Sequence, residues 1–324
     1  MTHATRRTLL LACAATLALC GCIRRVELRP RGIVAMNSTN SPTRQNDDGS
    51  VEVPPALLIG KTQTLPYDGL LWRFTRLPFV RATDTNRLVM LDTGLDWYAR
   101  VTLDVAAAER HPTLLDEAGG LAYVERLRLG KVEARSLPAV TWDQTNEYHI
   151  AFIPIYRMRG WILGNATLAQ AKYVAFDNVA RRVTIGQEPF APRRGLKWSS
   201  YPMRMRGGRP MVDLPLAGQT ISLLPDSAGG PKVILERPQW EQIRAHVRVR
   251  RTRTDSYPTW DGFEPVDEYT LERLQVGPVT LRNAVVWVRR AAKEDLVSTV
   301  GLGPFDDCVV VYDYAGKTFW IGRK

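Results

Sequence analysis

Short apolar runs separated by glycine, proline and polar turns dominate the chain after residue 72 and predict β-strands. One such run, Leu88-Val89-Met90-Leu91, ends directly at Asp92. A run of this length is typical of a buried strand that delivers a side chain at its tip. Two segments favour a helix instead, at 103–110 with its consecutive alanines and at 238–246. The pattern therefore predicts a mainly β protein with short helices.

The apolar pattern occurs twice, and each copy carries an aspartate at the same relative place. Gly164 follows Asp92 by 72 residues, and Gly301 follows Asp226 by 75 residues. In both copies an apolar residue directly precedes the glycine, Leu163 in the first and Val300 in the second, and each copy closes with an apolar hairpin that ends in Ile-Gly. Self-similarity at a fixed spacing is the signature of a duplicated structural unit. The sequence therefore predicts that two carboxylates are related by an internal symmetry.

The two copies predict two lobes, over residues 65–188 and 197–324, joined by a short linker that contains proline and arginine. Residues 22–64 contain few apolar positions and two runs of small polar residues, which indicates a flexible tether. For the part near 51–58 an extended segment that packs on the body is the alternative. The second copy is longer than the first between its aspartate and its mid-repeat glycine, 51 residues to Gly277 against 38 residues to Gly130. The extra residues fall around 248–267, and this stretch is expected to be a surface loop.

The first 21 residues are predicted to be a signal peptide. Two arginines precede an apolar stretch over 9–19 that is too short to span a membrane permanently. Leu19-Cys20-Gly21-Cys22 resembles a bacterial lipobox, which implies cleavage before Cys22 and lipidation of its thiol. By resemblance to bacterial sorting rules, Ile23 favours the outer membrane, facing the periplasm. A plain secretory signal is the alternative, and 5–9 also loosely resembles a twin-arginine signal.

The cysteine content and the net charge limit which disulfides, reactive thiols and binding partners the sequence allows. After cleavage and lipidation Cys308 is the one cysteine left, so no intramolecular disulfide is expected, and the apolar run after it predicts a buried, inert thiol. The formal charge of +11 comes from scattered basic residues, apart from a run at 248–253. No nucleic-acid-binding motif accompanies this run. The charge therefore indicates affinity for anionic lipids or acidic partners, or a solvated basic loop.

Metal and nucleophile chemistry find no support in the sequence. His111, His149 and His246 are far apart and lack metal-ligand spacing. Neither a Gly-x-Ser-x-Gly elbow nor a phosphate-binding glycine loop is present. We therefore expect neither a metal nor a cofactor.

The duplicated unit of an apolar strand, Asp-Thr/Ser and a later apolar-apolar-Gly strand resembles the pepsin-like aspartic peptidases, whose single-repeat relatives are the retropepsins. The resemblance covers roughly residues 70–324. It implies an all-β, bilobal acid-protease fold made of two retropepsin-like repeats. It also implies that Asp92 and Asp226 form a catalytic dyad, since two close carboxylates share one proton and can activate a water.

The resemblance assigns further roles near the dyad. The hydroxyls of Thr93 and Ser227 would tie the two aspartate loops together, and Gly94 would let the backbone pass close to the partner loop. Ala228 replaces the second glycine of the pattern, and its methyl group is expected to strain the turn or to push the carboxylates apart, unless the glycines after it absorb the change. Asp96 either adds a carboxylate near the dyad or caps a local turn.

The resemblance also implies a flap, a glycine-bearing hairpin tip that closes over the substrate. Gly119 and Gly120 are the candidates in the first lobe, and Gly262 has a comparable place in the second. A simple turn is the alternative for Gly119-Gly120. The predicted function is hydrolysis of peptide bonds in a peptide or protein by a lipid-anchored monomer. The alternative is a catalytically inactive protein of the same fold that binds an envelope peptide or protein.

Overall fold

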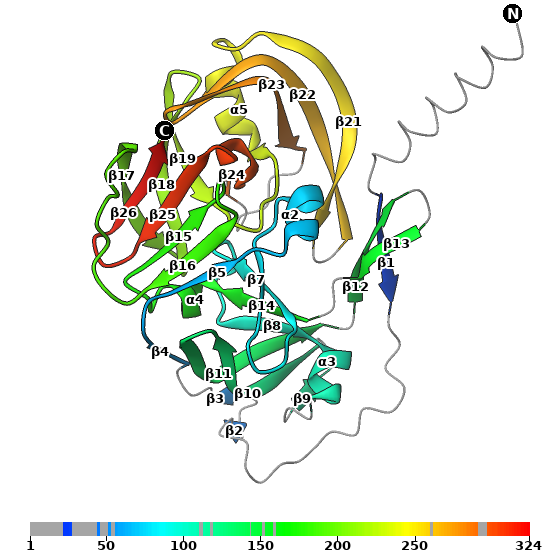
Figure 1. Cartoon of the computed structure of the whole chain (residues 1–324). Coiled ribbons are helices and arrows are strands. Elements are labelled where there is room, and N and C mark those ends of the chain that lie inside the picture. Colours follow the sequence, from blue (N-terminus) through cyan, green and yellow to red (C-terminus); the bar gives the residue numbers. More distant parts are fainter. Residues whose placement is uncertain are drawn as a thin grey trace, which may run out of the picture.

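Strands account for most of the described chain (Figure 1). The computed structural model describes residues 22–27, 44–45, 51–52, 56–109, 113–116, 119–142, 144–150, 153–157, 160–259, 262–290 and 297–324. The described helices are short: α2 (Gly69–Thr75), α3 (Leu103–Ala108), α4 (Asn165–Leu168), α5 (Arg237–Arg244) and the 3-10 helix η1 (Gly303–Phe305). The helices expected at 103–110 and 238–246 are therefore confirmed as α3 and α5.

The first lobe is built on a sheet with the strand order β6-β7-β14-β8-β11-β10-β9. Its strands are β6 (Phe79–Arg81), β7 (Leu88–Asp92), β8 (Ala99–Thr102), β9 (Thr113–Asp116), β10 (Gly119–Leu129), β11 (Val132–Trp142) and β14 (Trp161–Gly164). β7 runs parallel to β14, and β8 runs parallel to β11, whereas the remaining neighbours are antiparallel. The aspartate strand thus lies inside the sheet with a partner on each side.

The second lobe has the same order of equivalent strands, β18-β19-β24-β20-β23-β22-β21. These are β18 (Arg209–Leu216), β19 (Gln219–Pro225), β20 (Val233–Leu235), β21 (Val249–Thr259), β22 (Gly262–Val276), β23 (Val279–Arg289) and β24 (Thr299–Val300). Again the strand before the aspartate, β19, runs parallel to the short strand beside it, β24. The all-β, bilobal fold with short helices that the sequence predicts is confirmed.

The two lobes share a sheet with the order β17-β26-β25-β15-β16-β5. It is formed by β5 (Gln63–Pro66), β15 (Tyr173–Asp177), β16 (Arg182–Gly186), β17 (Lys197–Arg206), β25 (Cys308–Asp313) and β26 (Thr318–Arg323). The two closing hairpins meet at its centre, where Phe176 pairs with Val310. Figure 1 shows this sheet beside the two lobes, which lie above and below.

Both faces of the shared sheet are covered. Phe176 is fully buried against the main core, with its ring edge-on to Tyr312 at 5.7 Å between centroids. The opposite face carries Val309 and Val311, and linker residue Phe190 packs there against aromatic rings. The linker is therefore a structural cover as well as a connection.

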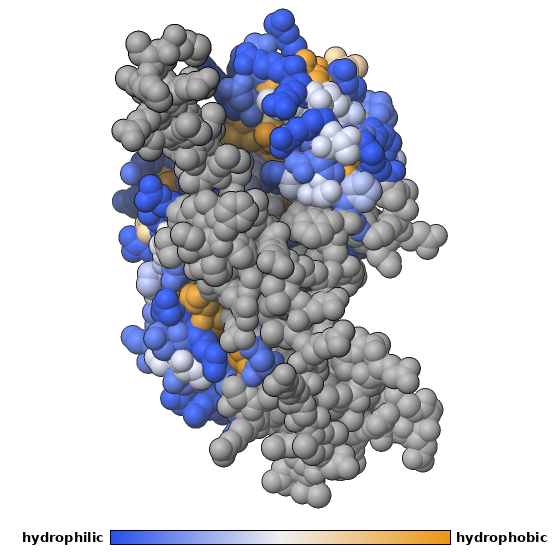
Figure 2. Space-filling model, turned by 90° about the vertical axis from the view of Figure 1, so that its right-hand side faces the viewer, coloured by the Kyte–Doolittle hydropathy of each residue, from blue (hydrophilic) through white to orange (hydrophobic). Residues whose placement is uncertain are grey.

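Two expectations need correction. Residues 248–267 form β21 and the start of β22 and not a surface loop, because β21 pairs with β22 from Val249 to Thr259. The basic side chains of β21 find acids across the hairpin, such as Arg253 with Glu268 at 2.7 Å. On the face shown in Figure 2, the described surface of the upper lobe is mainly hydrophilic.

The second correction concerns the predicted tether of residues 22–64, whose contact with the body reaches past the stretch at 51–58 for which such packing was the alternative. Its last part belongs to the folded body, because β4 (Leu57–Gly60) pairs with β11 and β5 pairs with β16. Earlier in the chain, β1 (Cys22–Glu27) joins β12 (Gln144–Ile150) and β13 (Ile153–Arg157), and β2 (Arg44–Gln45) pairs with β3 (Val51–Glu52). Among the described residues, no helix is long and apolar enough to cross a membrane.

Phe176→Ala tests the junction between the lobes. Truncating a fully buried phenylalanine leaves a cavity, and we expect the free energy of unfolding to fall by about 3–5 kcal/mol. Chemical denaturation measures this loss. Val179→Ala is the matched control, because that side chain is 48% exposed close by, and it should change stability by no more than about 0.5 kcal/mol. Equal effects of both substitutions would contradict this view of the junction.

Candidate active site

Asp92 stands at the end of the buried strand β7, where Gly164 of β14 lies directly beside it. A side chain at Gly164 has no room, since a Cβ there would lie 2.1 Å from the carbonyl oxygen of Trp97. The glycine therefore allows β14 to pass under the loop that follows Asp92.

Asp226 follows β19 in the same way. Its backbone N–H donates to the carbonyl of Val300 at 2.9 Å, and the next residue, Gly301, lies against the second loop. A Cβ at Gly301 would lie 2.1 Å from the carbonyl oxygen of Gly230. In each lobe, the glycine that recurs at a similar distance after the aspartate thus lies where two backbone segments pass too close for a side chain.

The two aspartate loops are joined by a symmetric set of buried hydrogen bonds. The Thr93 N–H donates to Ser227 Oγ, and the Ser227 N–H donates to Thr93 Oγ1, both at 2.9 Å. Each hydroxyl then donates to the strand of the other lobe, Thr93 to the carbonyl of Pro225 (3.0 Å) and Ser227 to that of Leu91 (2.7 Å). The geometry matches the role that the sequence resemblance gives to these two hydroxyls.

This connection brings the two carboxyl groups within hydrogen-bonding reach of each other. Asp92 is 4% exposed, and burial together with the charge of Asp226 raises its pKa well above the usual range. Burial also raises the pKa of Asp226. The backbone N–H of Ala228 and the charge of Arg209 act in the opposite direction and lower this pKa. One proton shared by the pair is the state that such mutual repulsion favours.

Each carboxylate is held by the backbone of its own loop. The N–H groups of Gly94 and Leu95 donate to Asp92 Oδ1 at 2.8 and 3.0 Å, and the Ala228 N–H donates to Asp226 Oδ1 at 2.8 Å. Gly94 lies against the partner carboxylate, because a Cβ there would be 2.6 Å from Asp226 Cγ. The first loop therefore requires glycine at this position.

Ala228 does not strain the second loop, contrary to expectation. Its φ lies outside the left-handed region, and its N–H makes the same contact to Asp226 that Gly94 makes to Asp92. Its methyl group packs against an apolar cluster of the first lobe that includes Met90 and Ile162. The alanine is therefore compatible with a closed pair of loops.

The sequence did not point to Arg209 or Tyr312. Arg209 begins β18 and donates to Asp96 Oδ2 at 2.9 Å, so Asp96 lies near the dyad as an ion-pair partner. The buried Tyr312 hydroxyl donates to the carbonyl of Pro225 at 2.9 Å, behind the second aspartate. Arg209 could have been found by counting back from Asp226 through the Ala217-Gly218 turn, which places these two residues opposite each other.

The flap candidates lie at hairpin tips. Gly119 and Gly120 begin β10 and pair with Asp116 and Leu115 of β9. Gly262 begins β22 and pairs with Thr259 of β21. The residues between the paired strands, 117–118 and 260–261, lie outside the described residues. The two lobes thus carry hairpins at equivalent places in their sheets, and closure over a substrate stays a prediction.

The remaining predicted sites lie elsewhere. Cys22 is the first residue of β1, and the predicted signal lies outside the described residues. Cys308 is fully buried as predicted, and its burial raises the pKa of its thiol, so it is not a nucleophile. Within the described ranges, no three acidic, histidine or cysteine side chains gather in a way that could hold a metal ion.

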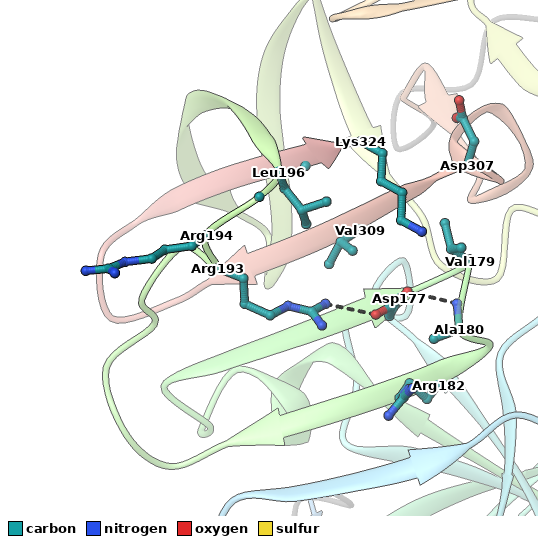
Figure 3. A pocket seen from close by; sticks show the side chains of 12 residues that line it. Asp177, Val179, Ala180, Arg182, Arg193, Arg194, Leu196, Asp307, Val309 and Lys324 are labelled. Carbon is teal, nitrogen blue, oxygen red and sulfur yellow. Dashed lines mark hydrogen bonds and ion pairs between the residues drawn. The ribbon is translucent and has the colours of Figure 1, made fainter.

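A hollow of about 570 Å³ lies away from the dyad, on the shared sheet (Figure 3). Its lining comes from the turn after β15, the linker and the C-terminal end, and it includes no residue of either aspartate loop. Arg193 donates to Asp177 there at 2.8 Å, while the side chain of Arg194 points away. Although this hollow is large, its lining contains neither aspartate, so it is not the candidate active site.

Comparison with known proteins gives similarity to solved structures only. They include a retropepsin-like aspartic protease from Rickettsia conorii (14% identity, TM-score 0.29, 41% of this chain and 97% of that one). Soybean basic 7S globulin (10%, 0.43, 81% and 94%) and lupine conglutin gamma (8%, 0.44, 82% and 96%) are also similar. No family model and no curated protein matches. Similarity of this degree carries no information on activity, which has to be inferred from the site.

Ser227→Ala tests the connection between the loops. The substitution leaves the Thr93 N–H and the Leu91 carbonyl without their buried partner, so we expect the free energy of unfolding to fall by roughly 2–4 kcal/mol. Urea denaturation provides the measurement. Ser222→Ala, on the strand β19 that leads to this loop but with an exposed contact to Arg204, should stay within about 0.5 kcal/mol of the wild type. Ser227→Ala with a similarly small loss would show that the crossed bonds contribute little.

Asp92→Asn tests the buried proton. A carboxyl group whose pKa is raised by folding opposes folding above its unfolded pKa of about 3.9, and the penalty grows until the raised pKa is passed. We therefore expect the variant to be more stable than the wild type at pH 7 and the difference to vanish towards pH 3. Denaturation at several pH values measures this. Asp84→Asn, in an exposed turn, is the control, and a gain that is independent of pH would refute the explanation.

Proposed function

We propose that this protein is an aspartic endopeptidase in which Asp92 and Asp226 activate a water for attack on a peptide bond. The observation that carries the proposal is the closed, symmetric geometry of the two loops. Two carboxyl groups within hydrogen-bonding reach are held by backbone N–H groups and joined through Thr93 and Ser227.

The proposed chemistry needs only the shared proton and a water. The ionised carboxylate takes a proton from the water, whose oxygen bonds to the scissile carbonyl carbon while the protonated carboxyl group donates to the carbonyl oxygen. The resulting tetrahedral intermediate collapses when the carboxyl group that took the proton of the water passes it to the amide nitrogen and the carbon–nitrogen bond breaks. As the carbonyl forms again, a hydroxyl of the intermediate gives its proton to the other carboxylate. The products are a carboxylic acid and an amine, and one carboxyl group is again protonated.

A binding protein of the same fold is the second candidate. The burial of Asp92 favours it, because a carboxyl group that is 4% exposed offers little surface to a substrate. Such a protein would hold an envelope peptide or protein beside the dyad without cleaving it. The two candidates differ in one measurable property, the cleavage of a bound peptide.

We further propose that the protein is anchored by a lipid on Cys22 and faces the periplasm. The sequence pattern around Cys22 supports this proposal. Labelling with a fatty-acid probe in cells, compared between the wild type and Cys22→Ser, tests the anchor directly. Its outcome is independent of the proposed activity.

A peptide library incubated with the full-length protein from acidic to neutral pH tests the activity. Asp92→Asn and Asp226→Asn should each lower the cleavage rate roughly 10²–10⁴-fold, because each removes a proton-transfer group. Gly94→Ala should also abolish cleavage, since its methyl group would displace the Asp226 carboxylate, whereas the matched change Ala228→Gly should preserve it. Binding of peptides without cleavage at any pH would favour the second candidate.

A further inference from the structure

The position of Arg209 beside the second aspartate is fixed by a tight hairpin turn. β17 and β18 are joined by Gly207-Gly208, both in the left-handed region with φ of 54° and 74°, so that Arg206 pairs with Arg209. On the other side, the β18–β19 register pairs Val212 with Leu223. Three residues further along, the same register places Arg209 opposite Asp226.

The turn before Arg209 is also fixed to the first lobe. The Asn165 side-chain amide donates to the Gly208 carbonyl at 2.7 Å, and Tyr314 donates to the other end of that amide at 2.6 Å. Gly208 lies close to the backbone of Asp96, whose carbonyl oxygen would be 3.1 Å from a Cβ at Gly208. Arg209 is therefore held between the loop of Asp92 and the strand that leads to Asp226.

The ion pair between Arg209 and Asp96 is too exposed to be explained by stability alone. The two side chains are 29% and 45% exposed. Pairs of this kind contribute only about 0–1 kcal/mol to stability. Its position near Asp226, in contrast, lets the charge of the guanidinium favour the ionised form of that carboxyl group.

The groups that face Asp226 come from three other elements. Asp92 and Asp96 lie on the first loop, Arg209 on β18 and the neutral Tyr312 on β25. Lys232, further along the second loop, is directed to Trp287 and lies 3.8 Å from Glu268. Among these described groups Arg209 is the cation on the side of Asp226, and it has no counterpart beside Asp92.

We propose that Arg209, held by Asp96, is a positioning residue that makes Asp226 the ionised member of the pair and Asp92 the protonated one. This inference rests on the proposed function, to which it adds the roles of the two aspartates. Asp226 would then accept the proton of the water, and Asp92 would donate to the scissile carbonyl. Asp92 is 4% exposed whereas Asp226 is half-buried, and this difference acts in the same direction, because burial favours the neutral form of a carboxyl group.

Two pH titrations of the full-length protein test the proposal. One follows the dyad by NMR of carboxyl-¹³C-labelled aspartate, assigned with Asp92→Asn and Asp226→Asn, and the other follows kcat/KM for a cleaved peptide. Arg209→Gln should move the titration of Asp226 and the acidic limb of the activity profile to higher pH. Arg209→Lys, which keeps the charge, should move both less.

Arg206→Gln is the matched control, because it removes the same charge from the same hairpin at an exposed position. Asp96→Asn separates positioning from simple charge. Loss of a negative charge alone would lower the pKa of Asp226, so an upward shift in this variant is expected only if Arg209 has been released. Equal shifts in Arg209→Gln and Arg206→Gln, or ionisation of Asp92 before Asp226, would overturn the proposal. Absence of cleavage would refute the proposed function, while the NMR titration would still decide the roles.

Discussion

The crossed hydrogen bonds between Thr93 and Ser227 are the interaction on which the site depends. Each lobe alone would present one aspartate at the tip of a strand, and neither strand could place its carboxylate against the other. The four bonds fix the distance and the orientation of two loops that are 134 residues apart in the chain. They also give hydrogen-bond partners to buried polar groups, which would be costly to leave unpaired in an apolar interior.

The rest of the fold brings these two loops to one place. The closing hairpins pair at the centre of the shared sheet, and its apolar faces are buried against the core on one side and the linker on the other. Tyr312 connects the shared sheet to the aspartate loops. It lies on β25 of that sheet, and its hydroxyl donates to the Pro225 carbonyl, which also accepts a hydrogen bond from the Thr93 hydroxyl. The shared sheet therefore helps to hold the two hydrogen-bonded aspartate loops in place.

The apolar pattern and the duplication were sufficient to predict the strands, the short helices and a symmetry that relates Asp92 to Asp226, since these depend on periodicity and spacing. The contact between the two aspartates was implied by the resemblance to a known family. Contacts across the lobes were not predictable in the same way. Arg209 and Asp96 meet through a hairpin register and a docked turn, and neither leaves a local pattern. The length difference between the copies predicted a loop at 248–267, whereas these residues belong to a strand pair whose contacts across the hairpin leave no local pattern.

The departure from perfect symmetry at the two loops follows from where each side chain would point. Gly94 lies against the Asp226 carboxylate and leaves no space for a methyl group, whereas Ala228 packs against the apolar cluster beside Met90. The same asymmetry appears in the charges, with Arg209 on one side only. A strictly symmetric pair would share its proton equally between both carboxyl groups. The differences between the two copies are thus what would give each aspartate a separate role.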